Sequence, residues 1–229
     1  MEELNAVLSE TVKGTPTVSI FGLFSVSSSI VISWIIMAFL VLSSILLTRN
    51  LKKFPTSKSQ MLLEMAVGSF NNFCKENLGQ HWRPFAPWLG TVGLYILCCN
   101  VISLFSLVPP TKDLSVTASL ALLSMLLIYG AQFRYRGFRG GLKKFADPSP
   151  LLLPMNIMEI LIRPLSLCMR LFGNILASYI IMEMIRTLVP VVVPAVFQLY
   201  FDIFDGLIQT VVFVFLTTLF VGEGIQEHE

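Results

Sequence analysis

Long apolar segments alternate with short polar ones along most of the chain. Three of them, at residues 30–48, 85–108 and 114–133, are close to the ~20 residues that a helix needs to cross about 30 Å of hydrocarbon. Two longer segments follow, at residues 150–188 and 191–221. The pattern predicts an all-α polytopic membrane protein.

The lengths of the five segments predict two kinds of helix. The first three match upright transmembrane helices, and residues 85–133 read as a transmembrane hairpin. The last two segments are too long for an upright helix and are divided by Pro190 and Pro194. A stretch longer than the bilayer must tilt or kink, so we expect residues 150–225 to form a hairpin of two long, strongly tilted helices.

Residues 57–82 follow a different pattern from the spans. Leu62, Met65, Ala66, Phe70 and Phe73 fall on one helical face. This spacing predicts one amphipathic helix that lies at the membrane interface or packs under other helices, although an ordinary connector would share it. Residues 1–29 are expected to be a surface segment, and the whole chain, 1–229, a single membrane domain.

The composition agrees with a membrane protein. Hydrophobic residues make up 55% of the chain and charged residues 13%, roughly half the share of a soluble domain. The basic residues after the first span (Arg49, Lys52, Lys53 and Lys58) and in the loop at 134–149 predict that these parts are cytoplasmic and the N-terminus outside. The basic loop suits anionic lipid head groups, not nucleic acid.

Nothing in the sequence predicts catalysis. The four cysteines lack metal-ligand spacing, and no phosphate-binding glycine loop or nucleophile–base arrangement is evident. We therefore expect no metal, no cofactor and no reaction on this chain. No cleavable targeting sequence is recognisable at the start, which favours a bacterial plasma membrane location.

Polar residues form two stripes inside the last two apolar segments. The first consists of Glu159, Arg163, Ser166, Arg170 and Asn174, and the second of Gln198, Asp202, Asp205 and Gln209. Both follow steps of three and four residues, which place them on one face of a helix. An arginine near the centre of a span costs about 2.5–3.5 kcal/mol, so Arg170 is expected to face a polar pathway or a partner charge. Two facing stripes suggest an ion route.

Several of these residues have a structural alternative. Glu159 and Arg163 are spaced as an i,i+4 ion pair and either neutralise one another or act directly. Asp202 and Asp205 could be bridged by other subunits or shielded by water. Two carboxylates at apolar depth more readily indicate a hydrophilic access path for the ion. Glu183 lies nearer a helix end, where it can reach the interface. Asn100, within the second span, either bonds a neighbouring helix or belongs to the ion path.

Particular motifs point to a family. The run R-P-L-S-L-C-M-R-L-F-G-N ends at Asn174, P-S-P-L-L-L-P precedes it, and Q-T-V-V-F-V-F-L-T begins at Gln209. With the turn V-P-P-T-K-D-L-S-V-T, these motifs resemble the subunit a family of F-type ATP synthases. The resemblance covers most of the chain from about Leu51 onward.

The resemblance implies a membrane stator beside a rotating ring of c subunits, held by peripheral-stalk b subunits. Arg170 matches the essential arginine of the family, and Asn174 and Gln209 match its polar neighbours. Asn100 matches an asparagine of the ion path. Some branches carry an acidic residue and a histidine where this chain has Tyr179 and Asp202, so we expect ions to pass by Asp202, Asp205, Glu183 and water.

The transported ion and one rival function remain open at this stage. Protons are the ion expected from family frequency, and Na⁺ is the alternative, since the selecting ligands of the family lie mainly on the ring. A stand-alone ion-coupled secondary transporter would also use an intramembrane arginine facing carboxylates. Such transporters often contain internal repeats, which this sequence lacks.

Overall fold

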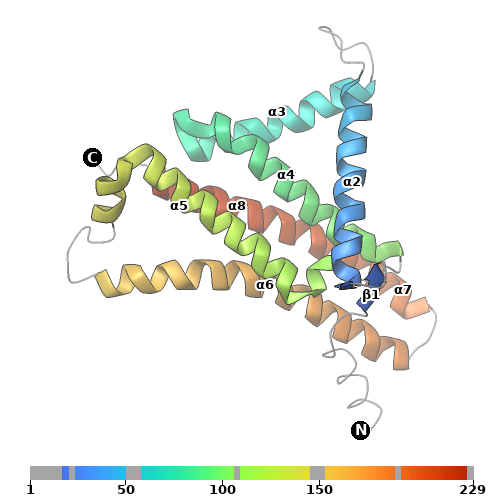
Figure 1. The fold of residues 1–229 in the computed structure, drawn as a ribbon. Coiled ribbons are helices and arrows are strands. Elements are labelled where there is room, and N and C mark those ends of the chain that lie inside the picture. The colour runs from blue at the N-terminus through green and yellow to red at the C-terminus, as the bar shows by residue number, and fades with distance from the viewer. Residues whose placement is uncertain are drawn as a thin grey trace.

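The computed structural model describes residues 17–20, 24–49, 58–105, 109–144, 153–188 and 192–225. It begins with a short antiparallel hairpin of β1 (Thr17–Ile20) and β2 (Phe24–Ser27), in which Thr17 pairs with Ser27. All other regular elements in these ranges are helical: α2 (Ser28–Thr48), α3 (Lys58–Leu78), α4 (Trp82–Val101), α5 (Leu114–Lys144), α6 (Leu153–Leu188), α7 (Val192–Leu199) and α8 (Gly206–Ile225) (Figure 1).

Short helical turns join several of these helices. Three are 3₁₀ turns, η1 (Gly79–His81), η2 (Ile102–Phe105) and η3 (Pro110–Lys112), and η5 (Tyr200–Asp205) is a π-helix between α7 and α8. Five helical segments of the described chain are long and apolar enough to cross a membrane: Ser28–Thr48, Lys58–Val101, Leu114–Tyr135, Met158–Met182 and Val196–Ile225. The prediction of an all-helical, multi-pass membrane protein is confirmed.

Helix α2 stands apart from the rest. It runs upright at one side of the molecule in Figure 1, and among its own residues only Ser29 and Ile36 are buried. Large apolar side chains such as Trp34 and Phe39 are exposed around it. A helix that is apolar all round and makes few contacts suits a lipid environment.

Helix α3 divides its apolar residues between two surroundings. Leu62 and Met65, near its start, are exposed, whereas Cys74 and Leu78, near its end, are buried. The positive φ of Gly79, 59°, ends the helix in a conformation that glycine adopts without strain. The chain then turns directly into α4, against which α3 packs.

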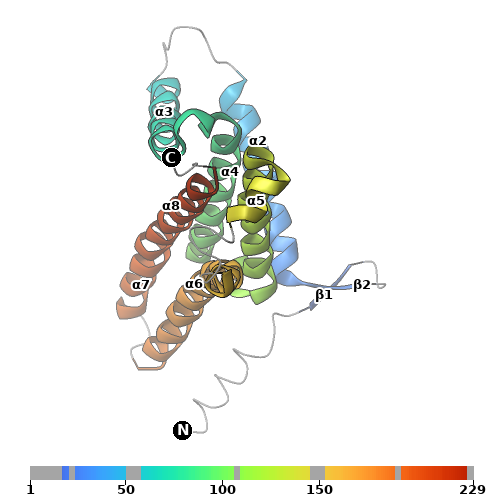
Figure 2. The same cartoon turned by 90° about the vertical axis from the view of Figure 1, so that its left-hand side faces the viewer.

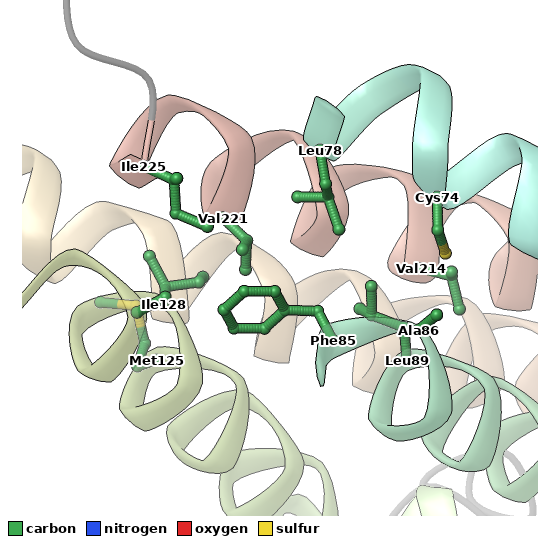
Figure 3. Close-up of a cluster of buried hydrophobic side chains, with 11 residues drawn as sticks. Cys74, Leu78, Phe85, Ala86, Leu89, Met125, Ile128, Val214, Val221 and Ile225 are labelled. Atoms are coloured by element: carbon green, nitrogen blue, oxygen red, sulfur yellow. The ribbon is translucent and has the colours of Figure 1, made fainter. Parts of the chain in front are cut away.

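The main core lies where α3, α4, α5 and α8 meet. Figure 3 shows side chains from all four helices converging on Phe85 and Leu89. A second cluster joins Val92 and Ile96 of α4 to α5, α6 and α8. Its members from α6 and α8 are Leu167, Cys168, Leu171 and Phe213. These two clusters fix the helices that carry the polar stripes.

Helix α5 is longer than the sequence predicts. The span was expected to end at 133 and a basic loop to occupy 134–149, but helical structure continues to Lys144 after a kink at Gly137. Its only non-helical residue is Gly137, with φ of 70°. Apolar character ends near Phe133, yet the basic and aromatic residues beyond it are compatible with a helix, so the end of the apolar run does not mark the end of the helix.

Helix α5 also contacts both of the last two long helices. It packs closely on both α6 and α8, whereas α6 and α8 meet mainly through long side chains. Figures 1 and 2 show α6 crossing the molecule at a steep angle to α2, with α7 and α8 returning along a different line. The polar contacts between α6 and α8 therefore help to set the relative position of these two helices.

The close approach of α4 to α8 depends on glycine and gives a first prediction. A Cβ placed on Gly93 would lie 2.9 Å from a methyl group of Val214, so Gly93→Ala should overpack this contact and cost about 1–3 kcal/mol. Gly130→Ala in α5 is the control, because its Cβ would meet no atom within 4 Å. Thermal unfolding of the purified protein in detergent should show a lower Tm for the first variant only, and equal Tm values would contradict the packing.

Candidate functional site

Arg170 occupies the middle of α6 at the border of the buried face. Leu167 and Leu171 are fully buried on one side, while Met169 is exposed on the other. The guanidinium nitrogen Nη1 of Arg170 is buried and makes no hydrogen bond to the described residues. A buried donor without an acceptor costs about 1–3 kcal/mol, and more when it is charged. This arginine therefore has room for an acceptor that the described residues do not supply.

One helical turn beyond Arg170, α6 is tied to α8. Asn174 Nδ2 donates a hydrogen bond of 2.7 Å to Gln209 Oε1. Gln209 is 3% exposed, and its own Nε2 is buried without a hydrogen-bond acceptor among the described side chains. Two unused donors, Arg170 Nη1 and Gln209 Nε2, thus belong to one group of three side chains. Such a group is suited to an anionic oxygen ligand such as a carboxylate.

Asn100 reaches the same helix from α4. Its Nδ2 donates to the carbonyl oxygen of Gly206 at 3.2 Å in a buried contact. A Cβ on Gly206 would lie 2.7 Å from Asn100 Cβ, so only glycine permits this approach. The bond to a neighbouring helix, one of the two alternatives for Asn100, is present one turn before Gln209.

The second polar stripe is interrupted by the π-helix η5. The N–H of Gly206 bonds the carbonyl of Phe201, five residues earlier, so this turn holds more residues than an α-helical turn. Gln198 Nε2 donates to the Ser103 carbonyl at 3.2 Å, whereas Gln209 faces Asn174. The expectation of one regular stripe from Gln198 to Gln209 was wrong, because it assumed 3.6 residues per turn throughout.

Two of the predicted carboxylates lie outside the described side chains. For Asp202, in η5, and Glu183, in α6, only the helical backbone is described. Asp205, at the end of η5, is partly buried directly before Gly206. Of the acidic residues in the second stripe, Asp205 is thus the one placed next to the Asn100 contact.

A second polar group lies nearer the start of α6. Arg163 donates to Glu159 Oε1 from Nη2 at 2.6 Å and from Nε at 3.1 Å, so the predicted i,i+4 pair is present. The same Nη2 also donates to Glu223 Oε2 of α8 at 2.9 Å. The sequence did not reveal Glu223, because its partner is 60 residues away and no periodic pattern joins them.

Tyr179 has an unexpected neighbour at the other end of α6. Lys112 Nζ lies 3.3 Å from the centre of the Tyr179 ring, in a cation–π contact between η3 and α6. The turn η3 thus covers the residue that replaces an acidic one in some branches of the family. The described residues contain no group of His, Cys, Asp and Glu suited to a metal ion.

Comparison with known proteins agrees with this arrangement. The family described as ATP synthase A chain matches residues 30–222. The chain belongs to this family. It is also 32% identical over 222 residues to the sodium-ion-specific ATP synthase subunit a of Propionigenium modestum, an alignment that covers 90% of this chain and 76% of that protein.

Membership of the ATP synthase A chain family defines the general function. The chain is an ion-translocating stator subunit of the membrane sector of an ATP synthase, and it interacts with other subunits of that complex. A stand-alone secondary transporter is not favoured. Of the three side chains that carry the resemblance most strongly, Asn174 and Gln209 are joined by a hydrogen bond, and Arg170 lies one helical turn before Asn174.

The tie between Asn174 and Gln209 gives a second prediction. Asn174→Leu or Gln209→Leu alone leaves a buried polar partner unsatisfied, whereas the double variant removes both. A double-mutant cycle measured by heat-induced unfolding in detergent should give a coupling free energy of about 1 kcal/mol. Purely additive effects on the free energy of unfolding would mean that the hydrogen bond does not hold the helices together.

Proposed function

We propose that Arg170 faces the ion-binding carboxylates of a rotating c-ring and makes each of them release its ion in turn. The observation that carries this proposal is the buried, unsatisfied Nη1 of Arg170 beside the Asn174–Gln209 bond. A guanidinium offers a planar fork of donors that stays charged, which a lysine does not provide. Gln209 Nε2, also unsatisfied, is a second donor for the same carboxylate.

The charge argument explains rotation. A ring carboxylate must be neutral while it faces lipid, because a buried charge is costly, and its ionised form is favoured beside Arg170. An ion reaches the ring through a water-filled half-channel open to one side and leaves through another open to the other side. Arg170 lies between the two and blocks a direct leak, so that rotation becomes the route across.

The polar residues divide between these half-channels by their place in the fold. We assign Asp202 and Asp205 of η5, Asn100 near the end of α4, and Gln209 to the outer half-channel. Glu159 lies toward the cytoplasmic end of α6 and belongs to the inner one. Glu183 is assigned to the outer half of α6. One elementary charge falling through 100 mV releases about 2.3 kcal/mol, so several ions pass for each ATP.

We further propose how the single membrane domain, residues 1–229, sits in the bilayer. Helices α2, α4 and α5 cross upright, α3 lies at the interface, and α6 and α8 are strongly tilted. The N-terminus is outside, since the exposed Arg49 directly follows the first span and the exposed Arg134 lies at the end of the α5 span, both on the side proposed as cytoplasmic. A bacterial plasma membrane is the proposed location.

The exposed faces suggest where the partners bind. Exposed apolar side chains follow helical steps on α6 (Met158, Leu161, Leu165 and Met169) and on α8 (Leu207, Val211 and Phe215). We propose that these faces form the surface for the c-ring, with Met169 directly before Arg170 in α6. The apolar surface of α2 is left for lipid and the peripheral-stalk b subunits.

We propose Na⁺ as the coupling ion, with the proton as the alternative. The relative from Propionigenium modestum is described as sodium ion specific. The only histidines of the chain are His81 and His228, and neither lies in the polar stripes, so an imidazole proton relay has no residue to use there.

Replacing Arg170 tests the proposed mechanism. Arg170→Ala and Arg170→Lys should each reduce ATP-driven ion transport by the assembled complex at least about 100-fold, since the charged group that acts on each ring site is lost or misplaced. Arg83→Ala, which removes an exposed arginine of α4, is the matched control and should transport normally. Near-normal transport by Arg170→Ala would overturn the proposal.

Labelled sodium decides the ion. Vesicles containing the whole complex should take up ²²Na⁺ on addition of ATP, and the uptake should persist or rise with a protonophore, which collapses opposing proton gradients. Absence of sodium uptake, with a protonophore-sensitive pH change in its place, would identify protons as the ion and would refute the sodium proposal.

A further inference from the structure

We propose that Arg163 is a positioning residue that, through Glu223, holds α6 against α8 at the height required by Arg170. This inference rests on the ring-facing role of Arg170 proposed above. Its basis is the contact of Arg163 with two side chains of α8: the 2.9 Å bond to Glu223 and a cation–π contact in which the guanidinium carbon lies 4.6 Å from the centre of the Phe220 ring.

The place of Arg163 in α6 makes this contact useful. Arg163 precedes Arg170 by seven residues, about 10 Å along the helix. Asn174 follows Arg170 by four residues, about 6 Å. Arg170 therefore lies between two ties to α8, Arg163–Glu223 and Asn174–Gln209. Two ties along one helix restrict both its tilt and its rotation, which a single tie does not.

The surrounding helix needs such a tie. Pro164 lies inside α6 directly after Arg163, and proline has no N–H to bond the carbonyl four residues earlier. This turn of α6 is thus less constrained by its own backbone. Close backbone packing does not hold this turn of α6 against α8, because α6 packs along α5 and not along α8.

The burial of the three charged side chains indicates positioning more than stability. The Arg163 side chain is 16% exposed, while those of Glu159 and Glu223 are 51% and 55% exposed. Ion pairs with exposed partners contribute little to the free energy of folding. Arg163 also meets Glu159 on its own helix, and this pair orients the guanidinium toward α8.

Charge exchange tests the tie in the whole ATP synthase complex. In Arg163→Gln and Glu223→Gln, we expect normal assembly but at least about a three-fold fall in ions transported per ATP hydrolysed, because loss of a charged hydrogen bond lets α6 move against the ring. The exchanged variant Arg163→Glu/Glu223→Arg, made together with Glu159→Gln to avoid a like-charge pair on α6, should recover most of the ratio shown by Glu159→Gln alone. Glu76→Gln, which neutralises an exposed glutamate of α3, is the matched control and should retain the original ratio.

The coupling ratio separates positioning from a general structural role. A structural defect lowers the amount of complex and its ATP hydrolysis together, whereas a misplaced Arg170 lowers transport per ATP. An unchanged ratio in both single variants, no recovery in the charge exchange, or failure of both single variants to assemble would each overturn the inference. If one of these results appeared while Arg170→Ala still abolished transport, only the inference about Arg163 would be overturned. Normal transport by Arg170→Ala would instead overturn the proposed function itself.

Discussion

The structure depends on keeping one charged side chain inside an apolar helix. A guanidinium at membrane depth is unfavourable by several kcal/mol unless it finds acceptors, yet Nη1 of Arg170 has none among the described residues. The cost is tolerated only if packing elsewhere holds α6 in place. The buried side chains Leu167 and Leu171, before and after Arg170 in sequence and on one face of α6, supply that packing within a cluster shared by α4, α5 and α8.

The scaffold around Arg170 is built from contacts that are strong without water. Transmembrane helices gain little from the hydrophobic effect between them, so close backbone approach and hydrogen bonds must hold them. At Gly93 and Gly206 the approach of α4 to α8 leaves no room for a Cβ. The Asn100 amide uses this closeness to reach the Gly206 carbonyl. Helix α8 is thereby held on its α4 side, and Asn174 of α6 bonds it on another side.

The sequence predicts the spans and the most local contacts well. Five helical segments able to cross a membrane follow from apolar length, and the Glu159–Arg163 pair follows from i,i+4 spacing. Contacts between distant segments leave no such signal, so Glu223 and the stacking of Lys112 on Tyr179 were missed.

Backbone departures from regular geometry were missed for another reason. The π-helix at Tyr200–Asp205 has no composition that distinguishes it from an α-helix, and it shifts every residue beyond it relative to the α-helical pattern. The extension of α5 to Lys144 was missed because hydropathy reports where lipid ends, not where a helix ends.

The way α6 and α8 are joined suits a stator. A surface that faces a rotor must present its charge at a constant height while the other side moves, and apolar side chains at a loosely packed boundary can slide past one another. Hydrogen bonds are directional, so two of them at different heights define one relative position of the helices. The shared Nη2 of Arg163 and the amide of Asn174 provide these two points. Arg163 and Asn174 thus join α6 to α8 at two heights, one before and one after Arg170 along the helix.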